Sequence, residues 1–432
     1  MRGVNAVALM ATLALAAFGE FAGPAGAQAP AVTAFEGARL IVGNGRPSIE
    51  NATVVVEGTK ITQAGAAVDV RVPEGAARVN LAGKTIMPTL IDTHTHLSQT
   101  REGLIQDLKR RAYYGVSAAL SMGTAETENE LQMRGETTPG MARVFTAWRG
   151  ITRPEPGRSK APFWIDTEAD GRKAVQELAA HKVDIVKIWV DDRDGKYPKL
   201  TPALYGAVID EAHKNGLRVT AHIFTLEDGK GLLRAGVDAF AHSVRDKDVD
   251  EAFVAMMKRR DVCYCPTLMR EVSTFVYDST PPWFSDPLFL KHADRAAVEQ
   301  LKEPARQEQM KTSKSAKAYK AGLEVANRNL KKLSDSGVKI AMGTDTGPPA
   351  RFQGYFELME LEMEAKAGLT PRQVLASATR DAARCQKLDA QVGTLEANKW
   401  ADFVVLNGDP LADVSNVRKI EDVYIAGNRV ER

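Results

Sequence analysis

The feature that most constrains the fold is a repeat that starts at residue 85, in which a short apolar run is followed by a helical pattern. Gly216, Gly236 and Gly337 stand where a helix would end and release the chain into the next run. Runs followed by helices in this way are typical of βα units, and eight of them in roughly 300 residues predict an α/β fold, a (β/α)₈ TIM barrel. The eight predicted strands are 85–97, 115–123, 142–150, 184–192, 218–224, 239–244, 262–268 and 339–345.

Two segments lie outside this repeat, at 32–84 and 392–431. Both are rich in short alternating strands with Gly and Asn turns, so they predict one small β-sandwich domain built from both termini. The barrel then spans 85–391. Within it, 269–334 is too long for a simple connection, and its place after the seventh strand predicts an insertion that forms a wall or lid of the active site.

The N-terminal 27 residues have the architecture of a secretory signal peptide. Arg2 precedes an apolar run at 6–18, and Ala25 and Ala27 provide the small residues of a cleavage site. A membrane anchor is the weaker reading, because the run is shorter than the ~20 residues that span a bilayer. We therefore expect cleavage after Ala27 and a periplasmic or secreted protein without membrane insertion.

Composition excludes several partner classes. The 432 residues are 44% hydrophobic and 26% charged, which is ordinary for a folded globular protein. The formal net charge of +2 suggests neither nucleic acid nor an anionic membrane as a partner. Cys263, Cys265 and Cys385 are odd in number, and a C-x-C pair along a strand is poorly placed to bridge, so we expect three core residues without a disulfide.

Histidine is rare in this chain, with seven in all, yet two stand one residue apart in the run "PTLIDTHTHL". Side chains at i and i+2 of a strand share a face, so Asp92, His94 and His96 point the same way, and two imidazoles there can share one metal. Other candidate ligands fall at or near the ends of later predicted strands, where this fold gathers its active site: Lys187, His222, His242 and Asp345. The sequence therefore predicts a metal centre.

These motifs resemble the metal-dependent amidohydrolase superfamily, in its imidazolonepropionase-like and Xaa-Pro dipeptidase (prolidase)-like branch. "DTHTH", the lysine of "IVKIW", "TAHIF", "FAHSV" and "GTDTG" occur in the family's order over nearly the whole chain. The resemblance implies two divalent metal ions, usually Zn²⁺, bridged by a hydroxide and by a carboxylated Lys187. It further implies that His94, His96 and Asp345 bind one ion, that His222 and His242 bind the other, and that Asp345 is the catalytic proton acceptor.

The chemistry of Lys187 supports its place in that set. Val186 and Ile188 flank it in a predicted interior strand, where an unpaired ammonium would have a large desolvation cost. As a carbamate between two cations, the same side chain becomes a neutralising ligand.

Residues that contact the substrate are harder to assign. Many relatives carry a Tyr shortly after the histidine of the fifth strand, and this chain has Phe224 there. Arg245 is the favoured candidate clamp for a substrate carboxylate, and the other candidates are Arg149, Arg153 and Arg193, since guanidinium groups match carboxylates in a bidentate way. The aromatic residues of the insertion suggest an apolar substrate group, or else they dock the insertion onto the barrel.

The function predicted from the sequence is a binuclear metal-dependent hydrolase that cleaves a C–N amide bond in a small molecule, such as a dipeptide or an N-acyl amino acid. A homo-oligomer is expected. The alternatives are a mononuclear deaminase or cyclic-amide hydrolase of the same superfamily, which generally lacks the lysine of the fourth strand, and a catalytically inactive binding barrel, which would usually lack a ligand.

Overall fold

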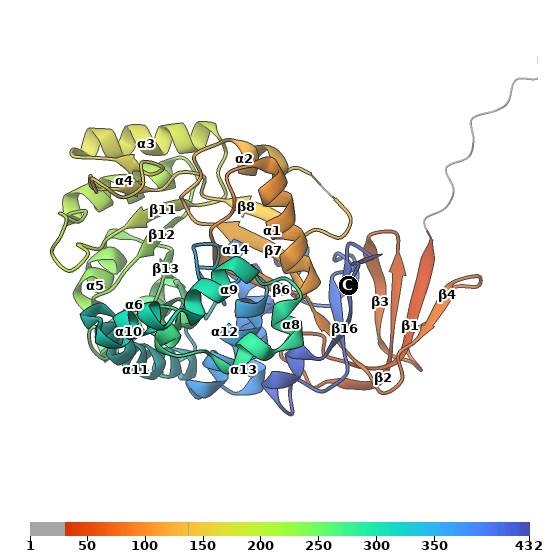
Figure 1. Cartoon of the computed structure of the whole chain (residues 1–432). Coiled ribbons are helices and arrows are strands. Elements are labelled where there is room, and N and C mark those ends of the chain that lie inside the picture. Colours follow the sequence, from red (N-terminus) through yellow and green to blue (C-terminus); the bar gives the residue numbers. More distant parts are fainter. Residues whose placement is uncertain (1–30, 137) are drawn as a thin grey trace, which may run out of the picture.

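The computed structural model describes residues 31–136 and 138–432, so the predicted signal peptide lies outside the described residues. Figure 1 shows a helix-rich part that surrounds short strands and, beside it, a sheet formed from both ends of the described chain. In the described ranges, no helix combines the length and the apolar character that a membrane crossing requires.

The terminal segments form one sheet of eight strands, in the order β17-β16-β15-β5-β1-β2-β3 with β4 paired to β1. Its core contains Phe35, Phe403 and Tyr424, and the rings of Phe403 and Tyr424 stack at 4.6 Å. The hydrogen bonds join all eight strands, where the sequence predicted a sandwich. The strands are β1 (Val32–Leu40), β2 (Ile49–Glu57), β3 (Lys60–Ala66), β4 (Ala77–Asn80), β5 (Thr85–Pro88), β15 (Phe403–Leu406), β16 (Ile420–Ile425) and β17 (Asn428–Arg429).

The first predicted barrel strand is divided between two sheets. Its beginning is β5, which pairs with β1 and β15, and its end is β6 (Leu90–Thr95), which pairs with β7 (Val116–Ser121). Thr89 marks the crossing, because its N–H donates to the carbonyl of Asp402 whereas the next N–H donates to Gly115. The prediction of one strand over 85–97 was therefore wrong in its extent, since an apolar run does not reveal which sheet each half joins.

The central strands run parallel in two sheets, β6-β7-β8 and β10-β9-β11-β12-β13-β14. The predicted eighth strand contributes only one isolated parallel bridge, Ile340 with Tyr264 of β14, and Thr346 just beyond it forms another with Thr95 of β6. The strand pairing of the described residues therefore does not form a closed barrel. The remaining strands are β8 (Arg143–Thr146), β9 (Ile151–Thr152), β10 (Phe163–Trp164), β11 (Val186–Trp189), β12 (Val219–His222), β13 (Ala239–Ala241) and β14 (Cys263–Cys265).

Helices follow these strands, and four of them begin at a threonine side-chain cap. Thr100, Thr167, Thr201 and Thr225 each accept a hydrogen bond from an N–H of the first turn of a helix. Gly216, Gly236 and Gly337 have the positive φ that the C-cap interpretation requires. The helices here are α1 (Arg101–Tyr113), α2 (Asn129–Met133), α3 (Glu168–Ala180), α4 (Pro202–Lys214), α5 (Leu226–Ala235), α6 (Glu251–Arg260), α12 (Tyr355–Lys366), α13 (Pro371–Ala378) and α14 (Arg380–Gln386), with the 3₁₀ turn η3 (Val414–Arg418).

The insertion after β14 is helical, and its aromatic residues face the core. Phe284 and Phe289 are buried and stack at 5.4 Å, and Phe289 packs 5.1 Å from Tyr355 of α12. This packing supports the docking alternative for the aromatic residues. The elements of the insertion are α7 (Leu268–Val272), η1 (Val276–Asp278), η2 (Pro282–Ser285), α8 (Pro287–Leu290), α9 (Arg295–Lys302), α10 (Pro304–Thr312) and α11 (Lys314–Asp335).

The cysteine prediction was wrong. Cys263 of β14 forms a disulfide with Cys385 of α14, and Cys265 is free and buried. Cys263 and Cys265 do not bridge each other, as expected, but the partner of Cys263 lies 122 residues away along the chain. Spacing within the sequence cannot show that α14 packs against this strand.

Candidate metal centre

The predicted ligands converge at one end of the parallel strands. A cavity of about 510 Å³ opens there, and five of the six predicted ligands line it. The five are His94, His96, His222, His242 and Asp345. Lys187, the sixth, is fully buried in β11, and its charge acts on the pKa values of His94, His222 and His242.

The distances within this cluster are those of groups that can share an ion. The Oδ1 atom of Asp345 lies 2.8 Å from Nε2 of His96 and 3.6 Å from Nε2 of His94. Ligand atoms of His94, His242 and Asp345 all lie within 4.8 Å of one another. The ring of His222 lies 4.4 Å from that of His242, centroid to centroid. The donor set of imidazole nitrogens and a carboxylate oxygen suits zinc or a similar divalent cation.

Hydrogen bonds to one ring nitrogen orient three of these imidazoles. Nδ1 of His96 lies 2.8 Å from the Thr124 hydroxyl, and Nδ1 of His242 lies 2.6 Å from the Thr267 hydroxyl. Both rings therefore offer Nε2 to the cavity. Such partners fix the tautomer and the ring orientation of metal-binding histidines.

His222 is held the other way round. Its Nε2 lies 2.8 Å from Oδ2 of Asp191, so Nδ1 is the ring nitrogen that remains for binding a metal ion. Arg193 in turn lies 2.6 Å from the same carboxylate oxygen. Asp191 is a functional candidate that sequence reasoning missed, although the run "WVDD" places it two residues after the end of its strand.

Burial sets the charge of the cluster. Desolvation lowers the pKa of His94, His222 and His242 well below the ordinary histidine value, so these rings are neutral and keep a nitrogen lone pair for a ligand. Burial acts to raise the pKa of Asp345, but Arg351 and the neighbouring imidazoles outweigh it and hold this pKa well below the usual range. The Nη1 atom of Arg351 lies 2.6 Å from Oδ2 of Asp345.

Lys187 is the most unusual group in the cluster. Its side chain has no exposed surface, and its Nζ has no hydrogen-bond partner among the described residues. Desolvation lowers its pKa to about 7. The surroundings are tight, because a Cβ on Gly150 would lie 2.1 Å from the ring of Trp189. Buried polar groups in proteins almost always have a hydrogen-bond partner, so a free ammonium group does not fit this position.

The backbone is strained at the same place. Asp345, His242 and Thr267 have φ values of 57°, 73° and 50°. Positive φ is uncommon outside glycine and is an outlier for a β-branched residue such as Thr267. Such residues cost about 1–3 kcal/mol each and concentrate at functional sites.

Of the predicted substrate contacts, Arg193 lines this cavity, whereas Arg245, Arg149 and Phe224 do not. Arg245 is buried against Glu271, with Nε 3.3 Å from Oε2, and its Nη1 donates to two backbone carbonyls. Its guanidinium lies over the ring of Phe224, and both residues line a separate cavity of about 160 Å³. Arg149 packs on Phe163 and donates to the carbonyl of Ala161. Each arginine is already engaged, which its place after a strand could not reveal.

Other arginines line the cavity of the histidines. They are Arg158, Arg193, Arg270 and Arg351, from loops and from α7. Arg158 is the most exposed, at 45% of its side chain, and its one ion pair joins its Nε to Glu155 at 3.2 Å. The histidines that we did not assign to the metal lie away from the cavity. His181, for example, stacks on Trp148 at 4.2 Å.

Comparison with known proteins identifies the family of this chain. The family model described as Amidohydrolase family matches residues 85–430. An imidazolonepropionase of Deinococcus radiodurans is 24% identical over 405 residues, which cover 88% of this chain and 92% of that protein. An uncharacterized protein of Mycobacterium tuberculosis is 28% identical over 216 residues, so the chain spans about half of that relative's length. The crystal structure of a Xaa-Pro dipeptidase with bound methionine in the active site has a TM-score of 0.72 and 19% identity, and the match covers 93% of this chain and 100% of that one.

The family match covers most of the chain and includes all six predicted ligands. This chain belongs to the amidohydrolase family. The resemblance inferred from its motifs is thereby confirmed.

Proposed function

We propose that this protein is a binuclear metal-dependent hydrolase that cleaves a C–N amide bond in a small molecule, such as a dipeptide or an N-acyl amino acid. The observation that carries the proposal is the buried Nζ of Lys187, which has no hydrogen-bond partner in the described ranges and interacts electrostatically with three histidines and with Asp345. Two cations and a carbamate would give every member of this cluster a partner.

The donor set fits a pair of divalent ions, which we propose to be Zn²⁺. His94, His96 and Asp345 would hold one ion, and His222 and His242 the other. An amine whose pKa is lowered to about 7 is about half in the free-base form at neutral pH, and that is the form that reacts with CO₂. Carboxylated Lys187 would then be the shared anionic ligand. When bound, such ions polarise an amide carbonyl and lower the proton affinity of a water.

The residues of the chain carry out the remaining steps. Asp345 is the proposed proton acceptor, and Arg351 holds its Oδ2 so that Oδ1 faces the imidazoles of His94 and His96. Asp191 positions His222 through Nε2. No serine or cysteine nucleophile is required, because an activated water attacks the amide carbon.

The proposal includes closure of the barrel. The segment 339–346 lies between β14 and β6, with N–H bonds from Ala341 to Tyr264 and from Thr93 to Met342. We propose that it acts as the eighth strand of a (β/α)₈ barrel. Asp345 would then lie beside His94 because their strands are neighbours.

The substrate is proposed to carry a free carboxylate. Four arginines line the cavity, and Arg158 has the most freedom to turn a guanidinium toward a ligand. Arg245, the clamp favoured by the sequence, is engaged with Glu271.

A mononuclear cyclic-amide hydrolase remains the second candidate. It is favoured by the coverage of the imidazolonepropionase relative and by the three residues His94, His242 and Asp345, which can hold one ion by themselves. The two candidate enzymes differ in the number of metal ions that they bind and in whether Lys187 is carboxylated. The deciding experiment is metal analysis and intact mass of the purified protein, coupled to a panel of dipeptides, N-acyl amino acids and cyclic amides.

Two equivalents of zinc, a mass increment of CO₂ and turnover of a linear amide are expected. One equivalent with turnover of cyclic amides alone would favour the second candidate. Two equivalents with no hydrolysis of any amide would overturn both.

Export to the periplasm or the medium is also part of the proposal. Support comes from the disulfide between Cys263 and Cys385, because disulfides persist in oxidising compartments and are rare in the cytosol. Mass spectrometry of the protein from the cell envelope and the medium would test it, with an N-terminus at Gln28 as the expected result.

A further inference from the structure

A second cavity, of about 450 Å³, lies at the opposite end of the parallel strands from the histidines. Pro88, which lines it, precedes β6, whereas His94 lies at the far end of that strand. Lys339, at the start of the eighth apolar run, also lines it. Because parallel strands share a direction, the two cavities lie at opposite faces of the strand region. The second one is in the seam between the terminal sheet and α13 and α14.

The inner surface of this cavity is apolar. Five side chains with 7% exposure or less contribute to it: Ile41, Met87, Val338, Ile340 and Leu375. Ile41 and Met87 come from the side of the terminal sheet, Val338 and Ile340 from the strand region, and Leu375 from α13. Protein atoms therefore do not fill the seam where these parts of the chain meet. A cavity of several hundred Å³ with such a surface has the size of a small-molecule site.

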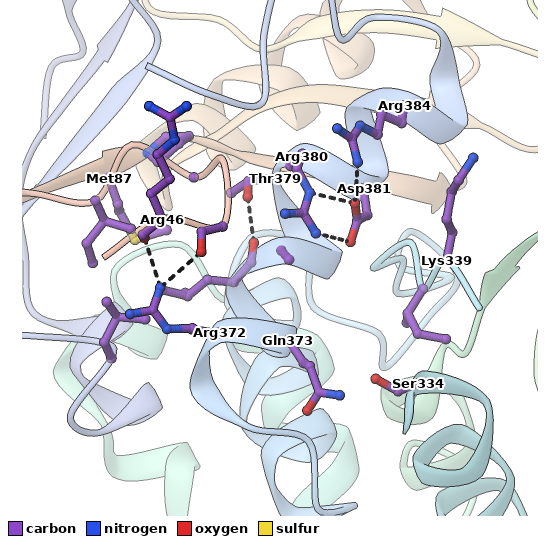
Figure 2. Close-up of a pocket in the computed structure, with 18 of the residues that line it drawn as sticks. Arg46, Met87, Ser334, Lys339, Arg372, Gln373, Thr379, Arg380, Asp381 and Arg384 are labelled. Carbon is purple, nitrogen blue, oxygen red and sulfur yellow. Dashed lines mark hydrogen bonds and ion pairs between the residues drawn. The ribbon is translucent and has the colours of Figure 1, made fainter. Parts of the chain in front are cut away.

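The entrance is cationic. Its charged lining residues are Arg46, Lys339, Arg372, Arg380, Arg384 and one carboxylate, Asp381. Figure 2 shows Arg380 and Arg384 both directed to Asp381, and Arg372 joined to the backbone beside Arg46.

Much of this positive charge is not neutralised. Arg380 donates to Asp381 through Nε and Nη2 at 2.8 and 3.0 Å, and Arg384 reaches the same carboxylate at 3.7 Å. Two arginines thus share one anion. Nη1 of Arg380 remains available and points to the loop at Gly45, where an added Cβ would lie 3.0 Å from it.

The other cations add to this excess. Arg372 donates to the carbonyl of Arg46 at 2.8 Å, and within residues 31–136 and 138–432 no carboxylate forms an ion pair with either of them. Lys339 pairs with Asp261, which lies outside the cavity. The four arginines and Lys339 carry five positive charges, and Asp381 and Asp261 carry two negative charges. Three positive charges therefore remain around the apolar interior.

We propose that this cavity binds an organic phosphate monoester whose apolar body enters the seam and whose dianionic head meets Arg46, Arg372 and Arg384. Guanidinium groups bind such heads through paired, charge-assisted hydrogen bonds. An apolar body is required because inorganic phosphate would leave the buried interior unfilled. The site is independent of the proposed hydrolysis, since it shares no lining residue with the cavity of the histidines.

The test is calorimetric titration of the whole metal-loaded protein with phenylphosphonate, a stable mimic of a phosphate monoester, and with methylphosphonate, which lacks the aromatic body. We expect one phenylphosphonate site per chain and binding of methylphosphonate at least about tenfold weaker. The double variant Arg46→Gln/Arg384→Gln should weaken phenylphosphonate binding at least about tenfold, because two charge-assisted contacts are lost. Arg259→Gln, which removes an exposed arginine of α6, is the matched control and should bind as the wild type does.

A second pair of variants locates the ligand. His94→Asn/His96→Asn alters the candidate metal centre and should leave phenylphosphonate binding unchanged. Loss of binding in that variant together with retention in Arg46→Gln/Arg384→Gln would assign the ligand to the metal centre and overturn the proposal. Absence of saturable binding to the wild type would overturn it too. Circular dichroism and melting temperature establish that each variant is folded.

Discussion

The two cavities are similar in size, about 510 and 450 Å³, but they differ in how their polar groups are held. In the first, the imidazoles of His94, His222 and His242 are at most 3% exposed and are carried by strand ends. In the second, the arginines lie on a loop and on helices, and the side chain of Arg384 is 50% exposed. Volume alone therefore does not identify a catalytic centre.

The difference has an electrostatic consequence. Removal from water shifts the pKa of every buried histidine and of Lys187 toward the neutral form, which prepares these groups as ligands. The arginines of the second cavity stay charged and suit reversible binding of an anion. Burial of titratable groups, together with strained φ at their positions, distinguishes the cavity of the histidines from the second cavity.

Lys187→Ala should have the largest effect. The shared anion would be lost, and two cations would face each other without it. We expect activity to fall by at least about a thousandfold and the metal content to fall with it. Metal analysis and kinetics with the best amide of the panel measure this, and Lys214→Ala, an exposed lysine of α4, is the control. Two bound ions and normal turnover in Lys187→Ala would remove the carbamate from the mechanism.

Asp345→Asn should be nearly as severe. An amide cannot accept the proton, so we expect kcat to fall by about 10²–10⁴-fold in a folded protein. Part of the loss would come from weaker metal binding, which metal analysis separates from the loss of turnover. A kcat close to that of the wild type would show that another group accepts the proton.

Asp191→Asn should act through His222. The hydrogen bond between residue 191 and Nε2 of His222 would be weaker, and we expect the metal affinity to fall by about 10–100-fold, as for other residues that orient metal-binding histidines. Added zinc should restore most of the activity, which a general folding defect would not allow. Asp194→Asn, at an exposed position in the same loop, should match the wild type. Equal zinc affinity in both variants would argue against a positioning role for Asp191.

Arg158→Ala should cause a smaller and more selective loss. If its guanidinium binds a substrate carboxylate, the wild type prefers the acid over its carboxamide by about tenfold, as expected for an exposed charge-assisted contact. The variant should lose that preference through KM. Arg153→Ala, which removes an arginine paired with Asp166 outside the cavity, is the control. If Arg158→Ala keeps the preference for the acid over its carboxamide, Arg158 does not bind the carboxylate, and Arg270 and Arg351 become the candidates.

Removal of the disulfide should affect activity least. The double variant Cys263→Ala/Cys385→Ala opens a loop of 122 residues and should lower the free energy of unfolding by about 2–5 kcal/mol. The cavity of the histidines lies at the other end of the strands, so kcat at 25 °C should change little. Denaturant unfolding with and without a reducing agent measures the effect. Equal stability of the variant and the oxidised wild type would show that the bridge contributes nothing.

Much of the site was predictable because its signals are local. His94 and His96 alternate along one strand, and the lysine in "IVKIW" is flanked by apolar residues, so each pattern can be read within a few positions. Strand ends gather at one face in this class of fold, which brought the separate motifs to one site. The helix C-caps at Gly216 and Gly236 were predictable for the same reason.

The contacts that were missed join residues far apart in the chain. Arg245 was favoured as a clamp, but only the folded chain brings Glu271 to it. Asp191 and Arg351 acquired roles because they meet His222 and Asp345 across loops. The partner of a side chain depends on how distant segments pack, and the residues next to it in the sequence do not show this.

By itself, then, the sequence determined the family and the identity of the candidate ligands, since these follow from local periodicity and from motifs in a set order. Only the tertiary structure decided that residues 85–88 join the terminal sheet, that Cys263 pairs with Cys385, that each arginine has a particular partner, and that a second cavity lies in the seam. The physical reason is that pairing, burial and desolvation are properties of groups brought together from distant positions, and they exist only once the chain has folded.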